Sequence, residues 1–145
     1  MSFNDAYCHT ASIDVNCTAE MALHYVADGI KQGEWALGSV DREQVADNLF
    51  VGSSMFSTDR QYIRIRPDLV NNVVFYDVGN DRENLLPRNI IHCVPGAVVG
   101  RPSNTCIVTL ISWRGEGSSD EAWFRHCVSH KTEMFIIKAR LEAGG

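Results

Sequence analysis

The chain has 145 residues, 45% of them hydrophobic, which is enough for one domain with its own apolar core. The formal net charge of −5 is spread without a block of like charges, which argues against nucleic acid as a partner. No apolar stretch is long enough to span a membrane, and the five cysteines follow no disulfide or metal-binding spacing. We therefore expect a single domain over residues 1–145 with reduced thiols and a cytoplasmic location.

The N-terminal part predicts a strand followed by a short helix. Residues 7–17 alternate between apolar and polar side chains, which is typical of a strand with one buried face. Thr18 suits a helix N-cap, and Gly29 offers a stop to that helix. The segment 33–39, with two glycines around Trp35, predicts a turn or a second short helix.

The middle of the chain predicts six short strands in succession. Each run of strand-forming residues is bounded by Asn, Asp, Gly, Ser or Pro, which favour turns. Such short connections join antiparallel neighbours. The expected strands are 42–46, 49–56, 61–66, 73–78, 88–94 and 105–113.

The C-terminal part predicts one long helix. Ser118 and Glu121 have the spacing of a capping box, and Gly144 offers a stop after about 24 residues without a helix breaker. The helix period predicts a buried face made of a main apolar stripe, Trp123, Cys127, His130, Met134, Ile137 and Leu141, and a flanking one, Phe124, Val128 and Phe135. The face predicted to be solvated holds Arg125, Ser129, Thr132, Glu133 and Arg140.

These elements predict an α+β domain with a cavity. A curved sheet of about seven strands is much wider than one helix, whose diameter is roughly 10 Å, so the helix cannot fill the concave face. Either bulky side chains fill the remaining space or a pocket persists. Concave sites lined by aromatic side chains and a few polar groups commonly bind small molecules.

The order of strand, short helices, six strands and long final helix resembles the helix-grip superfamily. This START/Bet v 1-like superfamily, also called SRPBCC, includes START domains, plant pollen-allergen proteins and bacterial polyketide cyclases. The segments 26–28 with Trp35, 130–133 and 141–142 are similar to it as well. Segment 47–53 lacks the multi-glycine loop of the plant allergens, so nothing specific to that branch is carried over. The resemblance implies a curved antiparallel sheet wrapped around the long C-terminal helix.

Several residues are candidates for the pocket lining. His130 lies on the apolar stripe of the final helix, where an imidazole is either a hydrogen-bonded core residue or a pocket acid or base. Arg64 shares one face of its strand with Tyr62, and if that face is not solvated, the guanidinium suits a ligand oxygen. The predicted ligand-binding residues are Trp35, Tyr62, Arg64, Tyr76, His92, Trp113, Trp123, Cys127, His130 and Met134, with His130 as the catalytic candidate.

Metal and thiol chemistry are the weaker interpretations. His126 and His130 have a spacing that can chelate a metal, but no H-E-x-x-H motif accompanies them, so we expect no metal. His92 and Cys93 are strand neighbours and point to opposite faces, and buried cysteines usually act as small hydrophobes.

Three functions remain open at this point. The first is binding of an apolar or amphipathic small molecule in the cavity between sheet and helix. The second is a cofactor-independent enzyme resembling polyketide cyclases and dehydratases, with His130 moving protons. The third is a protein-interaction module, and a homodimer is left open. No nucleotide-binding motif is present, and no cofactor is expected.

Overall fold

The computed structural model describes residues 6–144 and contains a seven-stranded antiparallel sheet in the order β1-β7-β6-β5-β4-β3-β2. Strands β2 to β6 each pair with the next strand along the chain, and β1 pairs with β7. Their bounds are β1 Cys8–Val15, β2 Val40–Ala46, β3 Leu49–Ser53, β4 Arg60–Asp68, β5 Val73–Gly79, β6 Leu86–Pro95 and β7 Cys106–Trp113. The expected α+β class and the curved seven-stranded sheet are confirmed.

One expected strand is too long. The strand predicted over 49–56 ends at Ser53, because the Ser54 hydroxyl accepts a hydrogen bond from the backbone N–H of Phe56 at 3.0 Å. The backbone N–H of Ser54 also donates to the carbonyl of Asp59. Together these bonds turn the chain toward β4.

Helix α1 (Ala19–Ala27) follows β1 directly, as the sequence predicts. The Thr18 hydroxyl caps it by accepting a hydrogen bond from the backbone N–H of Met21 at 3.2 Å. The expected second short helix is a 3₁₀ turn, η1 (Lys31–Glu34), and another 3₁₀ turn, η2 (Gly96–Val99), follows β6.

Helix α2 (Asp120–Glu142) begins one residue later than expected from the predicted N-cap, Ser118. The N-cap is Ser119, whose hydroxyl accepts from the backbone N–H of Ala122 at 3.1 Å. The predicted cap, Ser118, is wrong because the Arg114 guanidinium binds its carbonyl oxygen, with Nη2 donating at 2.6 Å. That contact keeps Ser118 in the preceding loop.

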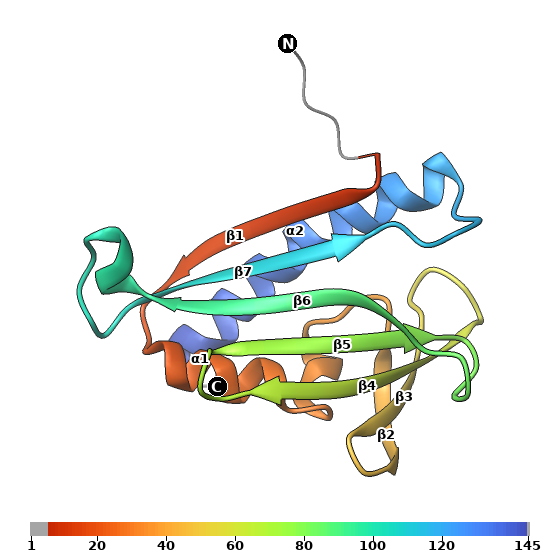
Figure 1. Ribbon diagram of the computed structural model, residues 1–145, viewed down its shortest axis with the longest axis horizontal. Helices are drawn as coiled ribbons and strands as arrows, with labels where there is room; N and C mark the ends of the chain where they lie inside the picture. Colours follow the sequence, from red (N-terminus) through yellow and green to blue (C-terminus); the bar gives the residue numbers. More distant parts are fainter. Residues whose placement is uncertain (1–5, 145) are drawn as a thin grey trace.

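Both helices lie on the same face of the sheet, and α2 runs beside β1 and ends next to α1 (Figure 1). The core between these layers is apolar along the main stripe that the sequence predicts for α2, including Met134, Ile137 and Leu141. No helix in the described part of the chain is long and apolar enough to cross a membrane.

The assignment of the other α2 faces from the sequence is wrong for five residues, whereas Arg125, Thr132 and Arg140 are exposed as expected. Phe124 and Phe135, expected to be buried, are 70% and 68% exposed, and Val128 is exposed as well. Ser129 and Glu133, expected in solvent, are only 9% and 5% exposed. The helix therefore turns a polar stripe toward the sheet, which is stable only where that stripe meets polar partners or a cavity.

Candidate functional site

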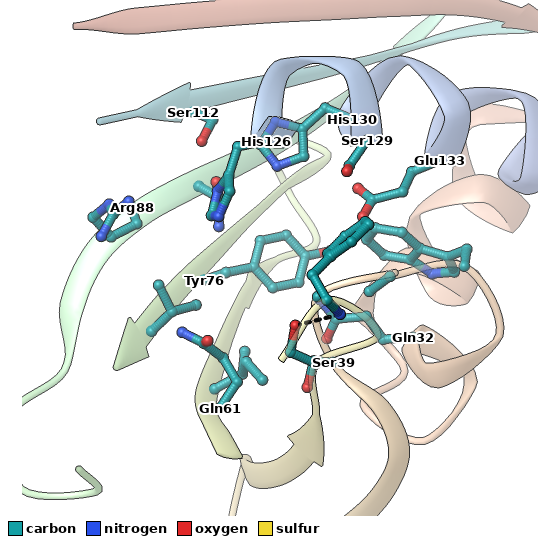
Figure 2. A pocket seen from close by; sticks show the side chains of 18 of the residues that line it. Gln32, Ser39, Gln61, Tyr76, Arg88, Ser112, His126, Ser129, His130 and Glu133 are labelled. Carbon is teal, nitrogen blue, oxygen red and sulfur yellow. Dashed lines mark hydrogen bonds between the residues drawn. The ribbon is translucent and has the colours of Figure 1, made fainter. Parts of the chain in front are cut away.

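A cavity of about 240 Å³ lies between the sheet, the segment around η1 and the N-terminal half of α2 (Figure 2). Its apolar wall consists of Trp35, Ile63, Tyr76, Val78 and Leu110. The remainder of the lining is rich in hydroxyl, amide, imidazole and guanidinium groups. The cavity lining is therefore amphipathic and not purely apolar.

Four residues on one face of α2 line the cavity. His126, Ser129, His130 and Glu133 follow the pattern i, i+3, i+4, i+7, so they form one stripe. Figure 2 shows all four side chains along the part of α2 that borders the cavity. This stripe lies beside the apolar one, and His130 belongs to both.

His130 is held among other ring systems. Its ring stacks on His9 of β1 with centroids 5.7 Å apart, and it meets His126 edge-on at 6.1 Å. Burial lowers the pKa of His130 most, and together with the smaller effects of the charges of His126, His9 and Arg88 it brings the pKa to about 3. The imidazole is neutral at physiological pH, so one ring nitrogen can donate and the other can accept.

Glu133 lies deeper along the same stripe. Its Oε1 accepts a hydrogen bond from the backbone N–H of Leu37 at 3.0 Å. Burial raises its pKa to about 8, and this outweighs the opposing effects of the Leu37 N–H and of Arg42. At neutral pH most of this carboxyl is protonated and can donate a hydrogen bond.

Arg42 reaches the cavity from β2 through fixed contacts. Its Nε donates to the carbonyl of Ser39 at 2.9 Å, and its Nη1 donates to Oε1 of Gln32 at 2.9 Å. Burial lowers its pKa to about 10, so the group remains a cation at neutral pH. These bonds tie the segment around η1 to β2 and fix one wall of the cavity.

Tyr76 lines the cavity, but its hydroxyl does not donate a hydrogen bond into it. Its hydroxyl donates to the carbonyl of Val26 at 2.5 Å, and its ring meets Trp35 edge to face. Burial raises the pKa of the phenol well above its usual value. The phenol proton is therefore bound to the Val26 carbonyl and is not donated into the cavity.

Four buried polar atoms at the cavity have no hydrogen-bond partner among residues 6–144. They belong to four different lining residues and are Trp35 Nε1, Ser39 Oγ, Asn89 Oδ1 and His130 Nδ1. Buried polar atoms in native proteins are nearly always satisfied, so each calls for an explanation. All four belong to residues that line this one cavity.

The same arrangement of sheet and helices occurs in solved structures. A START superfamily protein from Mycobacterium smegmatis matches with a TM-score of 0.66 and 9% identity, over 97% of this chain and 100% of that chain. The chain has the START/Bet v 1-like helix-grip fold. The Zhui aromatase/cyclase from Streptomyces sp. R1128 matches with a TM-score of 0.60 and 12% identity, over 95% and 97% of the two chains.

A third helix-grip structure is the di-domain ARO/CYC BexL from the BE-7585A biosynthetic pathway. It matches with a TM-score of 0.66 and 14% identity, over 93% of this chain and 46% of that chain. No protein-family model and no curated protein matches the sequence. At these identities the likeness concerns the helix-grip fold alone.

Three of the residues predicted to bind a ligand line the helix-grip cavity, namely Trp35, Tyr76 and His130. Trp123 and Met134 are buried outside the lining, and Cys127 is partly buried, also outside it. On α2 these three belong to the apolar stripe, which packs on the sheet and not on the cavity. Whether the lining residues bind a ligand stays a prediction.

The other four predicted residues lie on the wrong face of the sheet. Successive strand residues point to opposite faces, and Ile63 and Ser112 line the cavity. Their neighbours therefore point away from it, and His92 lies between buried Ile91 and Cys93 with the same result. The residues excluded from the cavity on this ground are Tyr62, Arg64, Trp113 and His92.

Sequence reasoning missed most of the polar lining. Ser112 continues the inward series Cys106, Val108, Leu110 of β7, and a polar residue at the end of such a series signals a polar pocket. The stripe from His126 to Glu133 on α2 carried a similar signal. No local pattern distinguishes Ser39 or Asn89, whose placement depends on the fold.

Proposed function

We propose that the protein binds a compact amphipathic small molecule in the cavity between the sheet and α2. The observation that carries this proposal is the set of four unpartnered polar atoms, which belong to four residues that line one cavity. A ligand with hydroxyl, carbonyl or carboxyl groups supplies their missing partners, because the set includes both donors and acceptors. The apolar wall of Trp35, Tyr76 and Leu110 suits the rest of such a molecule.

The size of the cavity supports a ligand smaller than a lipid. Its volume of about 240 Å³ lies below the roughly 300–1,000 Å³ that drug-sized ligands occupy. A long acyl chain does not fit in that space without opening the fold. Of the two ligand classes expected from the sequence, apolar and amphipathic, the cavity supports the amphipathic one.

Gly38 offers a way to test the cavity without disturbing the fold. It lines the cavity, and a Cβ added there meets no atom within 4 Å. Gly38→Phe therefore adds a phenyl ring at a residue of the cavity lining, and Gly38→Ala is the matched control. Protein purified from its own organism should release a stoichiometric small molecule on denaturation, detected by native mass spectrometry.

The expected result is that the molecule accompanies the wild type and Gly38→Ala but not Gly38→Phe. A clean apo mass for all three proteins, together with no thermal stabilisation by any small molecule, would contradict the proposal. That outcome would favour the third hypothesis, a protein-interaction module.

A second candidate function is cofactor-independent acid and base chemistry, as in a cyclase or dehydratase. It is favoured by one observation: a neutral imidazole, His130, and a mostly protonated carboxyl, Glu133, face the same cavity. Two of the similar structures are also described as aromatase/cyclases or ARO/CYC. Turnover of a cavity-bound compound that His130→Gln and Glu133→Gln abolish while leaving binding intact would establish it.

A further inference from the structure

Positive charge is concentrated at the cavity, although the chain as a whole is acidic with a formal charge of −5. Three arginines line it: Arg42 from β2, Arg88 from β6 and Arg125 from α2. Within residues 6–144, none of the three forms a salt bridge with a carboxylate. Arg42 and Arg88 are partly buried, whereas Arg125 is exposed. A partly buried cation without a counter-ion is unfavourable, because its desolvation is not compensated.

Arg88 is the best placed of these cations. Its Nε donates to the carbonyl of Trp113 at 2.8 Å, which fixes the direction of the side chain. The guanidinium also lies flat against Gly115, where an added Cβ would come within 2.4 Å of Nη1. The terminal nitrogens of Arg88 have no hydrogen-bond partner in the described part of the chain. The geometry therefore holds a guanidinium at the cavity with its donor fork available.

Arg125 and His126 complete a cluster with Arg88. The charges of Arg88 and Arg125 both lower the pKa of His126, in addition to the larger effect of its burial, so the three groups lie near one another. Arg125 also lies over the ring of Phe56, with 5.4 Å from its Cζ to the ring centroid. This cluster, Arg88, Arg125 and His126, is defined here as the basic wall (Figure 2 shows Arg88 and His126).

The acids near the basic wall do not neutralise it. Glu133 is mostly protonated at neutral pH because burial raises its pKa to about 8. Asp59 is exposed at the rim and forms no ion pair with any described residue. His130 and His126 are not anions in any protonation state. The cavity therefore keeps a net positive charge when empty.

Resting on the proposed small-molecule function, we propose that the ligand is an anion. Its carboxylate binds the donor fork of Arg88 in the basic wall, and its apolar body lies against Trp35 and Leu110. A guanidinium pairs with a carboxylate through two parallel hydrogen bonds, which gives direction as well as strength. The other polar atoms of the cavity then bind hydroxyl or carbonyl groups on the ligand body.

The test compares two aromatic probes of nearly the same size and shape, the anionic 2-naphthoate and the neutral 2-naphthamide, by isothermal titration calorimetry at neutral pH. We expect the wild type to bind the carboxylate at least about tenfold more tightly than the amide, since hydrogen bonds to charged groups are stronger than neutral ones. Arg88→Gln should remove this preference, and Arg88→Lys should retain part of it.

The matched control is Arg82→Gln, which removes the same charge from an exposed position in the β5–β6 connection that lines no part of the cavity. It should keep the full preference. If Arg88→Gln fails to fold, Arg125→Gln in the basic wall replaces it and should reduce the preference several-fold.

Equal affinity of the wild type for both probes would overturn the anion proposal and leave the proposed function standing. An unchanged preference in Arg88→Gln would also overturn the assignment of the carboxylate to this residue. Failure of both probes to bind would contradict both the anion proposal and a pocket for compact amphipathic molecules.

Discussion

The two halves of α2 face different surroundings on the same sheet. The C-terminal half, with Ile137 and Leu141, is buried in a continuous apolar core next to α1. The N-terminal half, with Ser129 and Glu133, faces a polar cavity. One helix thus closes a dry core at one end and a binding site at the other.

The difference follows from the position of α1. This helix packs against β4, β5, β6 and β7 and so fills the concave face at the C-terminal end of α2 (Figure 1). Beyond it, α2, the η1 segment and the loop between β3 and β4 border the remaining space. The apolar core at the C-terminal end of α2 makes the fold rigid. The cavity at the other end contains polar groups that have no hydrogen-bond partner in the described part of the chain.

The largest effect is expected at the dry end. Ile137→Ala should lower the free energy of unfolding by about 4 kcal/mol, because it leaves a cavity in a closely packed core. Ser129→Ala should lower it by less than about 1 kcal/mol, since the Ser129 hydroxyl bonds only to the carbonyl of Arg125 in its own helix. Urea unfolding measures both, and equal losses would refute the distinction between the two ends.

The next largest effect is a loss of folding stability at high pH, caused by Glu133. Its pKa is about 8 in the folded chain and 4.5 as the reference value, so its protonation stabilises the fold at low pH and this contribution is lost between the two values. From about pH 5.5 to 8 we expect the wild type to lose on the order of 3 kcal/mol relative to Glu133→Gln. Glu43→Gln on exposed β2 is the control and should show no such trend.

The contribution of His130 to the free energy of unfolding is expected to be lost as the pH falls, whereas that of Glu133 is lost as the pH rises. The pKa of His130 falls from 6.5 to about 3 on folding, so the neutral ring contributes fully above pH 6.5 and the contribution is lost as the pH falls. Between about pH 6.5 and 5 the wild type should lose on the order of 2 kcal/mol relative to His130→Gln. Denaturant unfolding at each pH measures this, and exposed His92→Gln is the control. Parallel curves for wild type and His130→Gln would show that the ring is not desolvated.

The smallest effect is expected on the outer face of α2. Phe135→Gln should change the free energy of unfolding by no more than about 0.5 kcal/mol, because this ring is exposed and glutamine suits a helix. Thermal and urea unfolding test it. A loss above about 2 kcal/mol would mean that Phe135 is buried, as its apolar character first suggested.

The fold was largely predictable because its signals are local. Thr18 as a cap, the alternation in β1 and the turns between β2 and β7 act over a few residues, and each was confirmed. The exceptions were also local, since the start of α2 depended on the contact between Arg114 and the carbonyl of Ser118. Such contacts involve side chains that a cap motif does not include.

The candidate site was less predictable because the polarity of a side chain does not determine whether it points into the protein or into solvent. Hydrophobic residues were assumed to face the core, which succeeded for Ile137 and failed for Phe135. Glu133 was assigned to the solvated face of α2 from the helix period, yet it is buried. Arg64 was chosen on a strand whose other face, with Ile63, lines the cavity.

By itself, the sequence determined the class of fold, the order of its elements and the three lining residues Trp35, Tyr76 and His130, since periodicity and turn chemistry are properties of neighbouring residues. Only the tertiary structure decided that Arg88 and Glu133 meet at one cavity. They come from a strand and a helix that are distant in the chain, and the rotation of α2 on the sheet, set by the packing of its apolar stripe, brings them together.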